Sequence, residues 1–540
     1  MQNKNFLIAF LVFFIALLGY NQFYAIPKSQ QLKAEEAAAQ AAQPQTAPQQ
    51  QNTPQPNQPA AAASAAPVKT SQNNEPETLI PFKTKTADIV FTSKGAGIKE
   101  FNYKDVVGDV NLTPYEGEGF YTTFPNVNFK ETARTGNSIT FAANSAGLEI
   151  AKTFVFNGDG INHLTLTLKN PGKTAATADQ FYFAFGPGLG TVKSEKGDNA
   201  REMKVVYTIQ EEGNKYLTLV NRGKQKIEES VKDGNWTWAG LANRYFLSVI
   251  IPKNWKAGLL ESDAKVVDSV PSFFGIFGKN DVSGPLLKID VPAAELGAGE
   301  TKAYESDFYF GPKDYKAFDK MPYQLDRAID FGFFGALGRL IRWVLEQLYR
   351  ITGNYGFAII LFAILFQGVM FRLTVMQQKS AVMMKKIQPE MKEVQERYKD
   401  DKAAQQQALM ALYKKHNFNP FMGCLPLLIQ LPIMIALFNA FRTSWSLHGA
   451  GFVLWITDLS AKDPYYVLPI IMGAVMFYQQ RLTAPTGGDP AQTAMLKWMP
   501  LIFTFMFLNF PAGLVLYWLT NSILGLIIQI VMIRKMEAKT

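Results

Sequence analysis

The hydrophobic positions of this chain first gather in one apolar run near the N-terminus, residues 6–25. The run has about the length that a membrane-spanning helix needs. It is longer than the core of a usual signal peptide, and no cleavage pattern of small residues follows it. Lys4 precedes the run, which keeps the N-terminus in the cytoplasm. We therefore predict an uncleaved transmembrane anchor over residues 1–26, with a cleaved signal peptide as the alternative.

Two regions of different pattern follow the anchor. Residues 27–77 consist of Gln, Ala and Pro with almost no large apolar side chains, so they cannot bury enough surface to offset chain entropy. This segment is predicted to be a disordered tether. Residues 78–320 contain short apolar and aromatic runs, and in 163–168 polar and apolar residues alternate with period two. The pattern predicts an all-β sandwich, which a single preceding anchor would place outside the cytoplasm.

Residues 321–352 have a helical rather than an alternating pattern. Leu337, Ile341, Leu345 and Leu348 recur at spacings of three and four, and charged residues fall between them. This amphipathic segment is predicted to lie along the membrane interface. A helix packed against the sandwich is the alternative.

Residues 353–540 contain five apolar segments, and two of the predicted spans are shorter than the ~20 residues that span a typical bilayer. The predicted transmembrane spans are 354–373, 421–441, 465–480, 495–510 and 512–533. With the anchor they make six helices, so both termini would be cytoplasmic. The segment between the second and third spans is rich in Lys and Arg, whereas the next one has only Arg442 and Lys462. By the positive-inside rule, the basic segment is cytoplasmic.

The basic segment, residues 378–416, is itself predicted to be a helical hairpin. Ile387, Met391 and Val394 step by three and four, and Pro389 is expected to kink the first arm. Its candidate residues for receiving substrate or a ribosome are Lys385, Lys386, Lys392, Arg397 and Lys399.

Charge and motifs exclude several classes of function. The net charge is +9, but the basic residues flank apolar runs and no nucleic-acid module is present, so we expect no specific nucleic-acid partner. Cys424 is the one cysteine, and the three histidines are scattered, which does not suggest a metal site. The chain has no phosphate loop, nucleophile elbow or zinc-protease motif. We predict a protein that is not an enzyme and needs no cofactor or metal.

Polar residues inside the apolar segments are the remaining candidates. A buried Gln or Asn is costly in a membrane unless it meets a partner or water. For any single one, hydrogen bonding between helices is the ordinary explanation; together they could line a hydrated cavity. The candidate substrate-groove residues are Gln367, Gln430, Asn439, Asn509, Tyr517 and Trp518. The two aromatic residues could equally be interfacial anchors.

Three local motifs resemble the YidC/Oxa/Alb family of membrane protein insertases. They are Asn419-Pro420-Phe421-Met422-Gly423-Cys424-Leu425-Pro426 with the span that follows, Leu454-Trp455-Ile456-Thr457-Asp458-Leu459-Ser460 with Asp463-Pro464-Tyr465, and Phe510-Pro511-Ala512-Gly513 leading to Tyr517-Trp518. The match covers about residues 325–535. The anchor, tether and strand-rich region resemble the Gram-negative form of the family, with its large periplasmic domain, in layout only.

The resemblance implies an insertase of the bacterial inner membrane. It would accept nascent membrane proteins, alone or with the Sec translocon, and bind their hydrophilic segments in a groove open to the cytoplasm and to lipid. The ribosome and membrane lipids are further implied partners. The family's periplasmic domain has a supersandwich fold, similar to that of sugar-binding proteins.

One departure from the family concerns the groove. The family usually has an arginine where this chain has Gln367, and Arg372 follows where proline is common. These two positions point roughly 140° apart on an α-helix, so Arg372 is a candidate for a relocated positive charge only with a kink or a register change. Ala363 also replaces a common hydroxyl residue. We therefore expect a hydrated groove that is less positive than usual.

Two other function classes fit parts of the pattern. A polytopic small-solute transporter or channel would also place polar groups within a helical bundle, but it predicts paired ionisable residues at midplane and internal repeats, and the sequence has neither. A membrane-anchored periplasmic ligand-binding module would need a concave site with paired carboxylates in the sandwich.

Overall fold

The structure is a computed structural model that describes residues 76–158, 160–178, 180–211, 216–222, 236–256, 260–271, 279–416, 425–483 and 490–537. The predicted anchor and nearly all of the predicted tether lie outside these residues.

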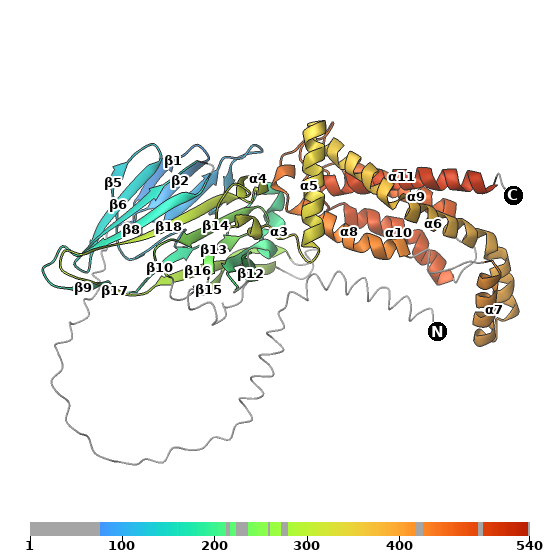
Figure 1. Cartoon of the computed structure of the whole chain (residues 1–540), viewed down its shortest axis with the longest axis horizontal. Helices are drawn as coiled ribbons and strands as arrows, with labels where there is room; N and C mark the ends of the chain where they lie inside the picture. The colour runs from blue at the N-terminus through green and yellow to red at the C-terminus, as the bar shows by residue number, and fades with distance from the viewer. Residues whose placement is uncertain are drawn as a thin grey trace, which may run out of the picture. The chain divides into compact units, whose positions relative to one another are not determined.

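The first described region is built from antiparallel strands (Figure 1). Its largest sheet has nine strands in the order β12 (Thr218–Arg222), β11 (Lys204–Ile209), β13 (Trp236–Ala242), β14 (Phe246–Pro252), β18 (Thr301–Pro312), β8 (Asn162–Lys169), β7 (Leu148–Val155), β6 (Ser138–Ser145) and β5 (Lys130–Arg134). The other sheets are β1 (Leu79–Lys83), β2 (Ala87–Thr92), β3 (Ile98–Tyr103) and β4 (Val110–Asn111); β10 (Phe181–Phe185), β16 (Lys279–Val291) and β15 (Leu260–Pro271); and β17 (Ala294–Leu296) with β9 (Ala176–Ala178).

An aromatic core holds the sheets face to face. Phe91 of β2 packs on Phe141 of β6 and Phe154 of β7, with ring centroids 5.2 and 5.0 Å apart. Along β8 the residues alternate between buried and more exposed positions, because successive side chains of a strand point to opposite faces. We call residues 79–312 the sandwich. The structure confirms that the region is rich in β-strands, although it also contains a short α-helix, α3 (Lys196–Glu202).

The second described region is helical. It contains α5 (Gly335–Thr352), α6 (Tyr355–Arg397), α7 (Lys402–Lys415), α8 (Leu425–Arg442), α9 (Val467–Thr483), α10 (Pro490–Phe507) and α11 (Ala512–Glu537). Helix α11 packs against α6 and α9, and α10 packs against α9. We call α5–α11 the bundle. Two short helices, α3 (Lys196–Glu202) within the sandwich and α4 (Tyr315–Phe318) after it, complete the described α-helices.

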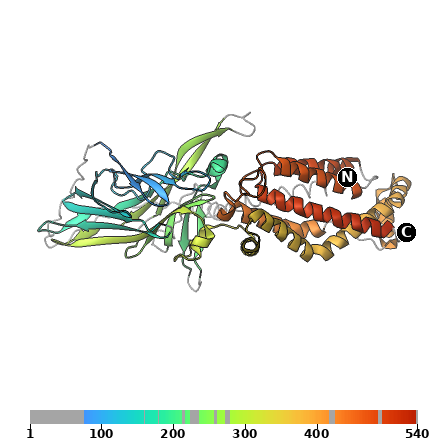
Figure 2. The same ribbon diagram turned by 90° about the horizontal axis from the view of Figure 1, so that it is seen from above.

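Helix α6 joins two predicted elements into one. It runs unbroken for 43 residues through the predicted span 354–373 and the first arm of the predicted hairpin. Asn354 caps its start by accepting hydrogen bonds from the backbone N–H groups of Gly356 and Phe357. Pro389 lies within the helix and does not end it. Helix α7 is the second arm and folds back against α6 (Figures 1 and 2).

Helix α5 has the expected two-sided character. It buries Gly338, Ile341, Leu345 and Leu348 and packs against α6 and α8, whereas Leu340 and Trp343 are exposed. In Figures 1 and 2 it runs across the direction of α8, α9, α10 and α11.

The predicted count of six transmembrane helices is not confirmed. Among the described residues, two stretches are long and apolar enough to cross a membrane, Tyr355–Met384 and Ala512–Lys535. A shorter apolar stretch covers Trp498–Phe507.

Candidate functional site

Tyr517 of α11 is the centre of a polar group inside the bundle. Its side chain is fully buried, and its ring packs on Phe362 and Phe366 of α6. Its hydroxyl faces the side chains of Gln430 from α8 and Asn521 from α11. Tyr517 and Asn521 share one helix face because residues four apart are neighbours on a helix. We call Gln430, Tyr517 and Asn521 the polar cluster.

Several oxygens on this side of α11 are buried and make no hydrogen bond of good geometry among the described residues. They are the hydroxyl of Tyr517 and the side-chain carbonyl oxygens of Asn521 and Gln529. The Gln529 amide does donate to the backbone carbonyl of Gln479, at 3.1 Å. By helical geometry, positions 517, 521 and 529 fall within about 120° of arc. A buried polar atom left unpaired costs about 1–3 kcal/mol, so these oxygens are suited to accept hydrogen bonds from a polar guest.

Gln367 and Arg372 are not part of this cluster. The Gln367 amide is half-buried and donates to the Thr374 hydroxyl on the same helix, at 3.3 Å. Arg372 is exposed. The structure therefore gives the glutamine a local partner and leaves the arginine on the surface of α6.

The other predicted groove residues lie in different places. Asn439 of α8 donates to the backbone carbonyl of Phe331, 3.1 Å away, and so holds the segment that leads into α5. Asn509 is exposed in the turn between α10 and α11. Trp518 packs against Phe503 and Phe507 of α10. Of the six predicted groove residues, the structure brings together Gln430 and Tyr517.

Asn521 belongs to this cluster although the sequence did not single it out as a groove residue. Its spacing of four from Tyr517 is the signal that could have identified it.

The predicted hairpin carries its basic side chains outward. Lys386, Lys392, Arg397 and Lys399 are exposed, and the side chain of Lys385 lies outside the described set. Near the end of the second arm, Lys415 and His416 pair with Glu390 of the first arm and thereby lower the pKa of its carboxyl group. The exposed basic residues remain available for contact with another molecule.

Metal binding has no support within the described residues, where no three His, Cys, Asp or Glu side chains gather closely enough to hold an ion.

Comparisons with known proteins find matches to both described regions of the chain. A family model described as the 60Kd inner membrane protein matches residues 347–539, and a model of the YidC periplasmic domain matches residues 121–344. The crystal structure titled "Active YidC insertase crystal structure with the first transmembrane domain resolved" aligns over 85% of this chain and 93% of its own, with a TM-score of 0.36 and 20% identity.

The sequence relatives cover most of the chain. The membrane protein insertase YidC of Endomicrobium trichonymphae is 34% identical over 470 residues, which are 85% of this chain and 86% of the relative. The membrane protein insertase YidC of Geotalea daltonii is 34% identical over 555 residues, 97% of each chain. Because this identity extends over nearly the whole length, the chain belongs to the YidC family of membrane protein insertases.

Proposed function

We propose that this inner-membrane insertase, with its periplasmic domain, receives the hydrophilic segment of a nascent membrane protein at the polar cluster. The observation that carries the proposal is the set of buried oxygens on α11 that make no hydrogen bond of good geometry among the described residues. A polypeptide segment brings unpaired backbone N–H groups, which are obligatory donors. Its donors and the acceptors of the cluster therefore complement each other.

The surroundings of the cluster support this role. The exposed face of α6 is apolar and includes Leu361, Leu365 and Val369, as suits contact with lipid tails. Polar atoms lie inward and apolar side chains outward, so a hydrophilic segment gains partners only by entering the bundle. Insertion by this route needs hydrogen bonding and solvation, without covalent chemistry or a cofactor.

We further propose that the site attracts substrates through polarity rather than through a fixed positive charge. Gln367 stands where the family usually has an arginine, and the exposed Arg372 does not replace it in the cluster. A neutral site imposes a smaller Coulomb penalty on basic segments than a cationic one would. This chain would therefore discriminate less between acidic and basic hydrophilic segments.

The complete topology belongs to the same proposal. Six spans with both termini in the cytoplasm would place the hairpin on the cytoplasmic side, where its exposed Lys386, Lys392, Arg397 and Lys399 can meet a ribosome or an emerging substrate. Cooperation with the Sec translocon and with membrane lipids is compatible with this arrangement.

Site-specific photocrosslinking tests the proposal. A photoreactive phenylalanine analogue replaces Gln430, Tyr517 or, as a matched control, Trp518, whose side chain packs on α10. Ribosomes stalled on a nascent membrane protein supply the substrate. We expect substrate adducts from positions 430 and 517 and few from 518. A lack of adducts at both cluster positions, or equal adducts at all three, would contradict the assignment.

A further inference from the structure

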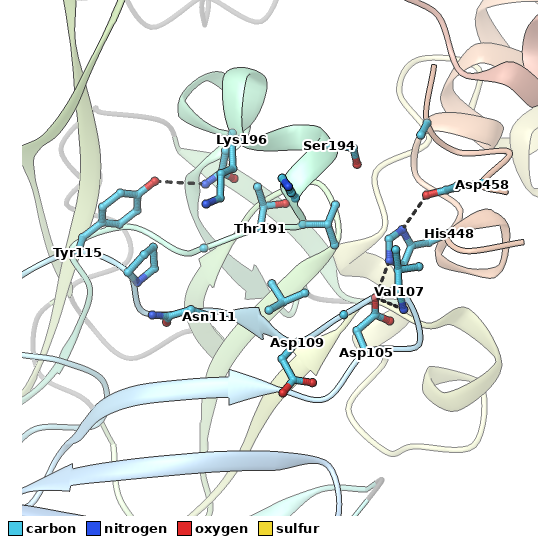
Figure 3. Close-up of a pocket in the computed structure, with 18 residues that line it drawn as sticks. Asp105, Val107, Asp109, Asn111, Tyr115, Thr191, Ser194, Lys196, His448 and Asp458 are labelled. Atoms are coloured by element: carbon cyan, nitrogen blue, oxygen red, sulfur yellow. Dashed lines mark hydrogen bonds and ion pairs between the residues drawn. The ribbon is translucent and has the colours of Figure 1, made fainter. Parts of the chain in front are cut away.

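The sandwich meets the bundle at His448. This residue lies in the segment 443–466 between α8 and α9, which we call the outer loop. Its Nε2 lies 2.8 Å from a carboxylate oxygen of Asp105, between β3 and β4 of the sandwich, and its Nδ1 lies 3.5 Å from Asp458 of the outer loop (Figure 3). The side chains of His448 and Asp105 are only 2% and 4% exposed. We call Asp105, His448 and Asp458 the His448 bridge.

Aromatic rings from both regions surround this bridge. Trp445 of the outer loop stacks on the His448 ring, with centroids 4.6 Å apart. The same indole also contacts Tyr103, Tyr245 and Phe246 of the sandwich. The imidazole is thus held in one orientation between the two regions.

The charge state of the His448 bridge follows from its neighbours. Burial alone lowers the pKa of His448, but hydrogen bonds and charge from Asp105 and Asp458 outweigh burial and raise it to about 9. Burial likewise opposes ionisation of the two carboxyl groups, yet contact with His448 keeps the pKa of each below its ordinary value. At neutral pH the bridge therefore consists of a cation between two anions.

A second polar contact joins the same regions at the end of α8. Arg244, in the turn between β13 and β14, donates from Nε to the backbone carbonyl of Arg442, 2.6 Å away. A cation at a helix C-terminus interacts favourably with the helix dipole and its unpaired carbonyl groups. The Arg244 guanidinium also pairs with Glu195, and Arg442 pairs in return with Glu202 of α3.

The outer loop borders a cavity on one side of the His448 bridge. This cavity of about 870 Å³ is lined by residues of the sandwich and of the outer loop, among them Asp105, Thr191, Lys193 and His448 (Figure 3). Asp109, Lys193 and Lys196 are further charged residues on the cavity wall, and all three are exposed.

The outer loop is joined to two helices of the bundle, α8 and α9. Its first residue follows α8, and near its end Asp463 accepts hydrogen bonds from the Trp455 indole and from the backbone N–H of Leu468 in α9. Fixing the loop consequently fixes the adjoining ends of α8 and α9. Helix α8 carries Gln430 of the polar cluster, and α9 packs against α11.

We infer that His448 is a positioning residue for insertion, which holds α8 and α9 in place by fastening the outer loop to Asp105 of the sandwich. The inference rests on the proposed function of the polar cluster. In this arrangement the sandwich stays attached during insertion and supports the bundle mechanically. Because the two side chains act through one contact, removing either His448 or Asp105 should slow insertion to the same extent.

A double-mutant comparison in the full-length protein tests this inference. His448→Gln and Asp105→Asn, alone and together, are reconstituted in liposomes, and insertion of a membrane-protein substrate is followed by its protection from protease. We expect each single variant to slow insertion about fivefold and the double variant to be no slower than the singles. His163→Gln is the matched control, because His163 pairs with Asp307 within the sandwich, and it should insert at the original rate.

Two further measurements distinguish a folding defect and a failure of the proposed function from a loss of the positioning role. Trypsin resistance of the sandwich reports folding, and Asp105→Asn, which keeps the shape of the side chain, serves where His448→Gln does not fold. Normal insertion by both single variants, or additive losses in the double variant, overturns the inference. Crosslinking from Tyr517 in the unaltered protein tests the proposed function separately: substrate adducts there, together with unimpaired His448→Gln and Asp105→Asn, would sink the positioning role alone.

Discussion

Two fully buried tyrosines, one in the sandwich and one in the bundle, differ in how their hydroxyl groups are paired. The Tyr121 hydroxyl in the sandwich lies 3.0 Å from the Ser248 hydroxyl and donates to the backbone carbonyls of Val249 and Tyr309 as alternatives, at 3.2 and 3.1 Å. The Tyr517 hydroxyl in the bundle lies near the side chains of Gln430 and Asn521 but makes no hydrogen bond of good geometry among the described residues. A buried hydroxyl without a partner costs stability and needs an explanation in each case, and the proposed role of the polar cluster supplies one for Tyr517.

The two regions also differ in which large apolar side chains they expose. The sandwich keeps its large aromatic side chains inside, as in Phe91, Phe154 and Trp238. The bundle exposes large apolar side chains along α6 and α10, for example Val369, Leu501 and Phe505. The surface of the sandwich suits water, whereas that of the bundle suits lipid. Only in the bundle do inward-pointing polar atoms offer a hydrophilic segment partners that its surroundings lack.

The largest expected effect concerns a lysine that is completely buried in the sandwich. Lys152 donates from Nζ to the backbone carbonyls of Gly95 and Tyr121 and to the Thr123 hydroxyl. Lys152→Met removes the donor and leaves these acceptors without it, so we expect the free energy of unfolding to fall by about 3 kcal/mol. Urea titration of the full-length protein, with protease resistance of the sandwich as the signal, measures this change.

Lys169→Met is the control for that prediction, since Lys169 pairs with Glu149 on an exposed face and should contribute about 0–1 kcal/mol. An equal urea midpoint for Lys152→Met and the unaltered protein would show that the buried amine is not part of what stabilises the sandwich.

Removing the hydroxyl group of Tyr121 or of Tyr517 should give the next largest effect, and it tests the comparison directly. Tyr121→Phe should lower the stability of the sandwich by about 1–2 kcal/mol, because it removes one buried hydrogen-bonding group. Tyr517→Phe should leave stability unchanged, but it should slow insertion of a substrate with a hydrophilic segment. Urea titration and liposome insertion assays on both variants check the two halves. If Tyr517→Phe destabilises the protein and Tyr121→Phe slows insertion, the comparison is reversed.

The strand pattern could be predicted from the sequence, but the sheet order could not. Alternation in 163–168 correctly predicts a strand with Leu164, Leu166 and Leu168 buried. Its neighbour β18 begins more than 130 residues later, with Tyr304 opposite Leu166. Period-two alternation contains no information about which distant strand will pair, so the nine-strand order emerges only from the folded chain.

The same limit applies to the candidate site. Gln430 and Asn439 were predicted on the same grounds, as polar residues in one apolar helix, yet the structure gives Asn439 a backbone partner at Phe331. Polarity shows that a side chain needs a partner, but not which neighbouring element supplies it. His448 illustrates this most clearly, because the histidines looked scattered in sequence and its partner Asp105 lies 343 residues away.

The attachment of the sandwich should depend on pH through the His448 bridge. The pKa of His448 rises on folding from 6.5 to about 9. The stability that His448 adds to the attachment is therefore fully present below pH 6.5 and is lost as the pH rises through 9. The lowered pKa values of Asp105 and Asp458 preserve the anions until the pH falls below their ordinary range. We expect a loss of about 1 kcal/mol between pH 7 and pH 8.

Protease cleavage of the outer loop at a series of pH values measures this loss. Cleavage should accelerate above pH 7 in the unaltered protein, and the acceleration should be smaller in His448→Gln. Identical pH profiles for the two proteins would assign the alkaline loosening to other groups.

The smallest expected effect concerns the position where this chain departs from its family. Gln367→Ala removes an amide whose partner, the Thr374 hydroxyl, lies on the same helix, and Arg372→Ala removes an exposed charge. Because neither side chain belongs to the polar cluster, each variant should insert substrate at a rate within about twofold of the original. Growth of a YidC-depleted cell on each variant, together with liposome insertion rates, provides the measurement. A loss at Arg372→Ala as large as that at Tyr517→Phe would mean that a positive charge assists insertion from the surface of α6, and that the polar cluster does not act alone.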